Sequence, residues 1–557
     1  MRFEAAARRP LLALWLIGAL LWFGPLDAPH LFEPDEGRYA EIPREMVASG
    51  DWVTPRLNAI KYFEKPALQY WATAGAFTLF GQHAWTARLW PAVCGFAGLI
   101  LTWSLSGRLY GRRAALFAVI VQASALLYMA LARIATLDMS LSFGLQMALY
   151  ALTLLARARA VPTAAAIRAP AQRFALPLLL GAGLAFAVLS KGLVGVLIPS
   201  AAAALYLLWM RDWALPLRAQ PWWSVLALAL LAAPWFLVVS RRNPEFAHYF
   251  FIVQHFQRYL SREGFDRYQP VWFFVPVLAL GFLPWTTLLP GALRQGWRDA
   301  RGGDRASAML LAWALVVFAF FSLSQSKLIP YIVPMLPALA AVTGKHLADI
   351  SAARLARHLL AVAIGAAAIG CVVLLLWTLP AAAALVETAS NASIAGFAAA
   401  FLLLALGAAA GARLARQGQP LAAAVAAGLG CWMLSQCALL AADELPRMRT
   451  LVELEARAQP WLGNSTRFYC VNDYLQPLAF YWRRPCTLVG YRGELDFGLK
   501  QEPWRWIPTL QQFAADWQRQ SDALAILRPE DYRQLAALGL PMRVIYTAQS
   551  LVAVVRR

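Results

Sequence analysis

The chain has 557 residues, of which 60% are hydrophobic and only 14% are charged. Soluble proteins carry about 25% charged residues, so this composition excludes an ordinary soluble protein. Apolar runs of roughly 18 or more residues recur along most of the chain, which predicts a multi-pass membrane protein. The net charge of +20 would indicate nucleic acid in a soluble protein; here it is expected to mark membrane orientation, with no nucleic-acid partner.

Thirteen membrane-spanning helices are predicted, the first as a retained helix because no small-residue cleavage site follows it. Every second loop is rich in arginine and nearly free of acid, starting with Arg2, Arg8 and Arg9. By the positive-inside rule, this alternation puts the N-terminus in the cytoplasm and residues 442–557 outside. The predicted spans are 11–28, 84–106, 114–131, 138–156, 174–190, 192–210, 221–240, 270–291, 307–324, 330–347, 357–379, 393–412 and 420–441.

Two loops on the predicted outer face are long, 29–83 and 241–269, and both mix acids, bases and aromatic residues. The first contains the charge-dense stretch FEPDEGRYAEIPREM, from Phe32 to Met46. That stretch is typical of an amphipathic helix lying in the membrane interface. Basic residues on this face are not topology signals, so they need another explanation.

Asp35 and Glu36 stand at the expected start of this helix. One interpretation is structural, with Asp35 as the N-cap and acids favoured in the first helical turn. The other interpretation is catalytic. The two are compatible, because an aspartate that caps a helix is held rigidly.

The segment YFEKPALQYW places Lys65 directly before a proline, a residue that favours the first position of a helix. A lysine beside the N–H groups of a helix start suits phosphate; the alternative is a lysine that only reaches the membrane interface. Glu64, with His255 or His248, is a candidate pair for a bound metal such as zinc, although the spacing alone is not evidence for one. No cofactor is required in this interpretation.

Further charges occur in short turns on the outer face: Arg133 and Asp138 in RIATLD, Lys191 in SKGL and Lys327 in SQSKLIP. Arg258 adds a cation in the second long loop. A charged side chain at the membrane end of a helix costs free energy unless it is paired or binds a ligand. These side chains are therefore predicted to converge on one anionic ligand. For Asp138, a direct catalytic role and a salt bridge are both open.

After residue 441 the pattern changes to short strand-like runs separated by helical segments. It predicts a transmembrane domain over 1–441 and an α/β domain over 442–557 on the periplasmic side. Cys470 and Cys486 flank one of the predicted helices. An oxidising compartment permits a disulfide between them, and two buried free thiols are the alternative.

The first outer stretch, together with DWVTPRLNAIKYFEKPALQYW, LSKGL, NPEFAHYFFIVQHFQRY and SLSQSKLIPYIVPMLP, resembles membrane glycosyltransferases of the GT-C fold. Within them it resembles most the bacterial lipid A aminoarabinose transferases. Protein O-mannosyltransferases are more distant relatives with an acidic pair in the first outer loop. The resemblance implies undecaprenyl phosphate carrying 4-amino-4-deoxy-L-arabinose as donor, lipid A phosphate as acceptor, and reaction in the outer leaflet of the bacterial inner membrane.

The resemblance also assigns roles to positions of this sequence. The first-loop acid is Asp35, and the phosphate-binding lysine is Lys65. Glu36 and Asp138 are the other catalytic candidates. Further residues are expected to bind the donor phosphate or to line its cavity: Arg38, Tyr39, Tyr62, Lys191, Arg258, Lys327 and Tyr331.

The residue chemistry fits two anionic lipid substrates, because cations rather than an acidic metal cluster would stabilise the leaving phosphate. Since the acceptor phosphate is already largely ionised near pH 7, Asp35 orients the acceptor, accepts a residual proton or holds the ammonium group of the sugar. The alternatives are a transferase with another sugar or acceptor, including protein hydroxyls, and a lipid-phosphate flippase. The lack of an internal repeat favours an enzyme. A monomer in contact with membrane lipids is expected.

Overall fold

The computed structural model of the chain describes residues 15–158, 170–257, 268–378 and 390–556. Packing divides the chain into two compact units, each taken by itself below. The first long loop groups with the C-terminal segment, whereas the sequence predicted domains 1–441 and 442–557. The helical unit is Met1–Leu26, Arg88–Ala383 and Ile394–Leu439, and the α/β unit is Asp27–Ala87, Ala384–Ser393 and Leu440–Arg557.

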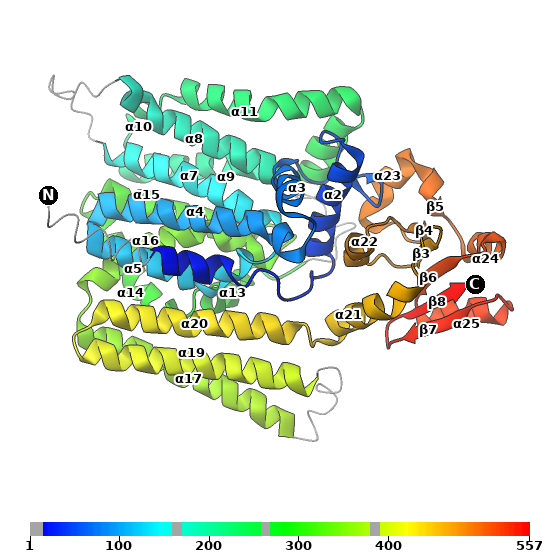
Figure 1. Cartoon of the computed structure of the whole chain (residues 1–557). Helices are drawn as coiled ribbons and strands as arrows, with labels where there is room; N and C mark the ends of the chain where they lie inside the picture. Colours follow the sequence, from blue (N-terminus) through cyan, green and yellow to red (C-terminus); the bar gives the residue numbers. More distant parts are fainter. Residues whose placement is uncertain (1–14, 159–169, 258–267, 379–389, 557) are drawn as a thin grey trace. The chain divides into compact units, whose positions relative to one another are not determined.

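Long apolar helices make up most of the helical unit (Figure 1). In the described part of the chain, eight helices are long and apolar enough to cross a membrane, or up to nine if one bent pair is a single span. The prediction of a mostly helical, multi-pass membrane protein is confirmed. The eight are α4 (Ala84–Tyr110), α7 (Leu137–Arg157), α8 (Pro170–Lys191), α11 (Pro221–Arg242), α15 (Arg305–Leu323), α17 (Ala352–Thr378), α19 (Asn391–Arg416) and α20 (Pro420–Ala442).

The predicted number of thirteen spans is not confirmed, because several of them are short or broken. The span predicted over 270–291 bends by 113° after α13 (Phe274–Gly281) and continues into α14 (Leu289–Arg301). Pro284 lies at the bend and has no backbone N–H to continue the helix. Shorter elements stand elsewhere: α5 (Arg112–Ser124), α6 (Leu126–Leu131), α9 (Val194–Met210), α10 (Leu215–Ala219), the π-helix η1 (His248–Gln257), the 3₁₀ helices η2 (Thr286–Leu288) and η3 (Ile329–Met335), and α16 (Leu336–Asp349).

Two helices and a small hairpin form from the first long loop. The longer helix, α2, is covered on all sides, and every residue from Glu36 to Met46 is buried. The prediction of an amphipathic interface helix is therefore wrong for α2. A Cβ on Gly37 would lie 2.4 Å from the backbone nitrogen of Pro477, so only glycine allows this close approach to α22. The elements are α2 (Asp35–Ser49), β1 (Arg56–Leu57), β2 (Ile60–Lys61), α3 (Leu68–Phe80) and, from the C-terminal segment, α22 (Gln476–Trp482).

The C-terminal segment forms a six-stranded sheet of order β5-β4-β3-β6-β8-β7, which confirms the predicted α/β architecture. The first four strands in this order are parallel to one another, and β8 is antiparallel to β6 and β7. The strands are β3 (Arg467–Val471), β4 (Thr487–Val489), β5 (Trp506–Ile507), β6 (Ala523–Leu527), β7 (Arg543–Thr547) and β8 (Val552–Arg556). The remaining helices are α21 (Pro446–Ala458), the 3₁₀ helices η5 (Gln459–Trp461), η6 (Gly493–Leu495) and η7 (Pro503–Arg505), α23 (Asp496–Gln501), α24 (Leu510–Arg519) and α25 (Pro529–Ala537).

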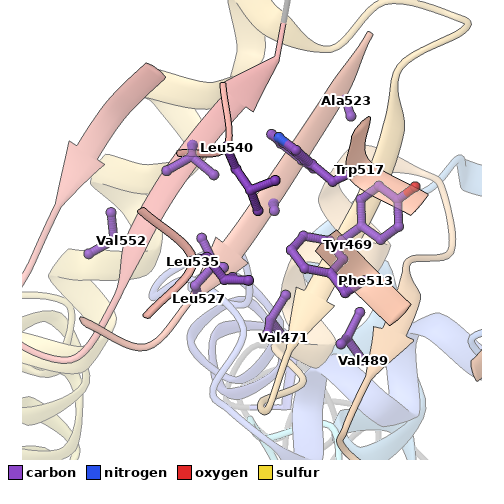
Figure 2. Packing of buried hydrophobic residues seen from close by; sticks show 12 residues of the cluster. Tyr469, Val471, Val489, Phe513, Trp517, Ala523, Leu527, Leu535, Leu540 and Val552 are labelled. Atoms are coloured by element: carbon purple, nitrogen blue, oxygen red, sulfur yellow. The ribbon is translucent and has the colours of Figure 1, made fainter. Parts of the chain in front are cut away.

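One face of the sheet carries the core of the C-terminal segment (Figure 2). Tyr469 of β3 lies against Phe513 and Trp517 of α24, with ring centroids 5.2 and 6.1 Å apart. Leu527 of β6 and Leu535 of α25 extend this core. Full burial of a side chain such as Phe513 contributes about 1.5–3 kcal/mol, so the sheet is a firm support for the loops at its edge.

Cys470 and Cys486 are both buried and both free, so the structure has two thiols rather than a disulfide. Burial raises the pKa of the Cys486 thiol well above its usual range. Cys486, which directly precedes β4, is also hydrogen-bonded to the first long loop. The Asn58 side chain donates to the Cys486 carbonyl at 2.8 Å and accepts from the Cys486 N–H at 2.7 Å.

Candidate functional site

Asp35 does not cap its helix. It is the first residue of α2, and the N-cap position is Pro34, which has no capping side chain. The adjacent Glu36 has the local structural role instead, because its buried carboxylate accepts the backbone N–H of Phe32 at 3.0 Å. Asp35 makes no capping hydrogen bond, and 46% of its side chain is exposed.

Arg38 is the centre of a charged cluster in the α/β unit. Its side chain is only 6% exposed and contacts Asp35 at 3.2 Å. From the opposite side it makes two bonds to Glu494, at 2.5 and 3.2 Å. Gln476 of α22 donates to the same Glu494 carboxylate at 2.9 Å. Two carboxylates, those of Asp35 and Glu494, bind the Arg38 guanidinium. The guanidinium therefore faces these acids and not an open phosphate site.

Two tyrosine rings lie beside this guanidinium, and a third packs on one of them. The central carbon of the guanidinium lies 5.7 Å from the Tyr39 ring and 6.0 Å from the Tyr62 ring, and Tyr39 stacks on Tyr70. The hydroxyls of Tyr62 and Tyr70 and the Gln69 side-chain oxygen are buried without a hydrogen-bond partner among the described residues. A buried polar group without a partner costs about 1–3 kcal/mol. These atoms are therefore suited to bind oxygen or hydroxyl groups of a ligand.

Buried acids also occupy the second half of α2. Arg44 binds the Glu41 carboxylate through two bonds of 2.6 Å. Glu45 accepts the N–H of Ala59 through both oxygens, at 2.9 and 2.8 Å. Burial, and then the negative charge of Glu41, raise the pKa of Glu45 well above its usual range. Much of the charge that the sequence shows in this stretch thus supports the fold.

Lys65 lies in the turn before α3, together with Glu64. The predicted helix through ALQYWATAGAFTLF is present as α3, which begins at Leu68 with Ala67 as its N-cap, so Lys65 precedes the N-cap by two residues. Both side chains are half-buried and take part in interactions. The assignment of Lys65 to phosphate stays a prediction.

The predicted metal pair also stays a prediction. Among the described residues, no group of three or more His, Cys, Asp or Glu side chains is placed to hold a metal ion. The side chain of His255 and the whole of Arg258 lie outside the described residues.

In the helical unit, Asp138 pairs with Lys191. Asp138 lies in the first turn of α7 and Lys191 ends α8, and their charged atoms are 2.5 Å apart. The Lys191 ammonium also lies 4.6 Å from the centre of the Tyr331 ring. The salt-bridge alternative for Asp138 is therefore confirmed, which leaves a direct catalytic role as a prediction.

The other predicted cations of the helical unit bind backbone carbonyls. Lys327 donates to the carbonyls of Gln269 and Ser324, at 2.8 and 2.6 Å. Arg133 donates to the carbonyls of Met129 and Leu21, at 3.1 and 3.2 Å. Burial of a cation is costly without such partners. Backbone carbonyls thus bind part of both cations, but the Arg133 Nε is buried without a hydrogen-bond partner among the described residues. Convergence of these two residues on one anionic ligand stays a prediction.

Sequence reasoning missed the contributions of Glu494 and Gln476. Glu494 is 456 positions from Arg38 and lies in an ordinary polar segment, YRGELDF. No spacing rule links residues at this separation. Tyr70 and Gln69 were also missed, although they belong to the same YFEKPALQYW segment as Lys65.

Comparison with known proteins connects both units to one family. A family model described as aminoarabinose transferase C-terminal domain matches residues 454–556. A second, described as dolichyl-phosphate-mannose-protein mannosyltransferase, matches residues 11–250.

Individual relatives agree. The chain is 34% identical over 339 residues to the undecaprenyl phosphate-alpha-4-amino-4-deoxy-L-arabinose arabinosyl transferase of Aeromonas salmonicida, covering 61% of this chain and 60% of that protein. It is 32% identical over 550 residues to the transferase of the same name from Pseudomonas aeruginosa, covering 96% of both. The crystal structure of ArnT from Cupriavidus metallidurans bound to undecaprenyl phosphate matches with a TM-score of 0.88 and 35% identity, over 98% of each chain. By this similarity over nearly its whole length, the chain belongs to the aminoarabinose transferase family, membrane glycosyltransferases of the GT-C type.

Proposed function

We propose that this protein transfers 4-amino-4-deoxy-L-arabinose from undecaprenyl phosphate to a phosphate group of lipid A. The observation that carries the proposal is the half-exposed carboxylate of Asp35, held by the buried Arg38. Beside it lie tyrosine hydroxyls for which the described residues offer no hydrogen-bond partner. The names of the relatives and the undecaprenyl phosphate bound to ArnT support the donor. Lipid A as acceptor and action as a monomer belong to the same proposal.

In this reaction, an acceptor phosphate oxygen forms a bond to the anomeric carbon of the sugar. The bond from that carbon to the donor phosphate oxygen breaks, and undecaprenyl phosphate leaves with the electron pair. Asp35 orients the acceptor, takes its residual proton or holds the sugar ammonium, while Lys65 binds the departing phosphate. Arg38 fixes the direction of the Asp35 carboxylate, because Glu494 prevents the guanidinium from turning away.

The reaction is placed at the periplasmic face of the bacterial inner membrane, with the N-terminus in the cytoplasm. The arginine-rich loops support this orientation. Single cysteines at the exposed positions Ala48 and Gln501, in a cysteine-free background, test it with an impermeant thiol reagent in intact spheroplasts. Labelling of either cysteine only after the membrane is opened would contradict the orientation.

The activity is tested with purified protein, the lipid-linked aminosugar and lipid A in detergent, with mass spectrometry of the products. We expect lipid A to gain one aminoarabinose residue. The Asp35→Asn variant should lose this activity, whereas Asp496→Asn, the same change at an exposed ion pair of the α/β unit, should keep it. Exchange of the lipid between liposome leaflets without sugar transfer would identify a flippase instead.

A further inference from the structure

A cavity of about 790 Å³ lies in the helical unit, and none of the candidate residues above lines it. This volume is in the range of ordinary ligand sites. One wall is formed by Leu311, Leu315 and Phe318, which follow a single face of α15 over about 10 Å. No acidic residue lines it, and apolar side chains dominate its surface.

One end of the cavity is cationic and aromatic. Arg294 and Arg298 of α14 line it beside Trp297, which stacks near Trp209 of α9 with ring centroids 4.9 Å apart. In the part of the chain that the structure describes, neither arginine forms an ion pair with Asp or Glu. Tryptophan and arginine at the end of an apolar groove are typical of the level at which lipid head groups lie.

The face of α14 about 100° further round the helix binds α16. Asp299 binds Lys345 of α16 at 2.8 Å, and Gln295 binds Asp349 at 2.7 Å. The polar groups that face α16 are thereby matched. The cavity face keeps two cations above an apolar wall, which is the charge pattern complementary to an anionic lipid.

We propose that this cavity binds an anionic phospholipid of the leaflet next to the arginine-rich loops. Its phosphate lies against Arg294 and Arg298, and one acyl chain lies along Leu311, Leu315 and Phe318. The site is distinct from the proposed donor site, because α14 belongs to a loop on the arginine-rich side, whereas the donor phosphate is proposed to bind on the other. A polyprenyl tail would fill the apolar wall but would leave the two arginines without a phosphate.

Native mass spectrometry of the full-length protein tests the proposal, with phosphatidylglycerol and phosphatidylcholine added in equal amounts to the detergent. We expect wild type to retain phosphatidylglycerol in preference. Each basic residue near an anionic surface contributes about 1 kcal/mol, so Arg294→Gln with Arg298→Gln should lower retention about 30-fold. Arg416→Gln, the same change at an exposed arginine of α19, should have no effect.

A second variant tests the apolar wall without a change of charge. Leu315→Trp should also abolish retention by filling the groove, whereas Leu406→Trp, at an exposed leucine of α19, should not. The melting temperature checks that each variant is folded. Equal retention of phosphatidylcholine, equal loss with Arg416→Gln, or displacement of phosphatidylglycerol by equimolar undecaprenyl phosphate would each overturn the proposal. The last result would assign the groove to the donor tail and would leave the proposed function intact.

Discussion

Replacing Glu494 with glutamine should release Arg38 from one of its two carboxylates. The change keeps the shape of the side chain, but glutamine has only one acceptor oxygen, so of the two bonds at 2.5 and 3.2 Å one becomes neutral and the other is lost. A charged hydrogen bond contributes about 1.5–3 kcal/mol and a neutral one about 0.5–1.5 kcal/mol. The combined loss is therefore about 2.5–4.5 kcal/mol, and Asp35 is the one carboxylate that still contacts the buried Arg38 among the described residues.

The expected result is a fall in melting temperature of roughly 5–18 °C, since 1 kcal/mol corresponds to about 2–4 °C for a domain of this size. The sugar-transfer assay should show a lower kcat with little change in the KM for the donor, because the proposed role of Arg38 is to position Asp35 and not to bind the donor phosphate. Glu530→Gln, at an exposed pair 4.0 Å apart, is the matched control and should shift the melting temperature by less than about 1 °C.

A double variant separates the ion pair from general damage. Arg38→Gln combined with Glu494→Gln removes both charges, so no buried ion is left unpaired. Its loss of stability should be smaller than the sum of the two single losses, by about 1–3 kcal/mol. Additive losses, or a melting temperature of Glu494→Gln equal to that of wild type, would refute the role given to Glu494.

Three further predictions concern Asp35, Asp138 and Glu45. Asp35→Asn should lower turnover about 10²-fold or more in the sugar-transfer assay, at nearly unchanged melting temperature, because its pair with Arg38 is half-exposed; full activity would exclude it as a catalytic group. Asp138→Asn should leave Lys191 buried without its carboxylate and lower the melting temperature, while Lys191→Gln in the same chain should partly restore it; a lower value for the double variant would contradict the pairing. Because the pKa of Glu45 is raised in the folded protein, its contribution to stability is fully present below about pH 4.5 and is lost as the pH rises through the raised pKa. The fall in melting temperature from pH 4.5 to 8 should thus be smaller in Glu45→Gln than in wild type. An equal fall in both proteins would show that Glu45 is not the source of this pH dependence.

The sequence alone determined those features that depend on local pattern. Apolar length predicted helices at the places where α4, α7 and α15 lie, and short apolar runs with helical segments between them predicted the α/β sheet. These features follow from hydrophobic periodicity and from the cost of placing backbone or charge in lipid, which act within some twenty residues. The motifs of the outer loops, taken together, were sufficient to indicate the family.

The tertiary structure decided how the charges are used. The sequence favoured Asp35 as a helix cap and an exposed face for α2; packing against α22 instead buries α2, and no side chain caps its first turn. Glu36 accepts the N–H of Phe32, which lies before the helix. The pairing of Arg38 with Glu494 joins residues 456 positions apart. A buried charge takes whichever partner the fold brings within about 3 Å, and that distance is set by long-range packing, which no local pattern in the chain encodes.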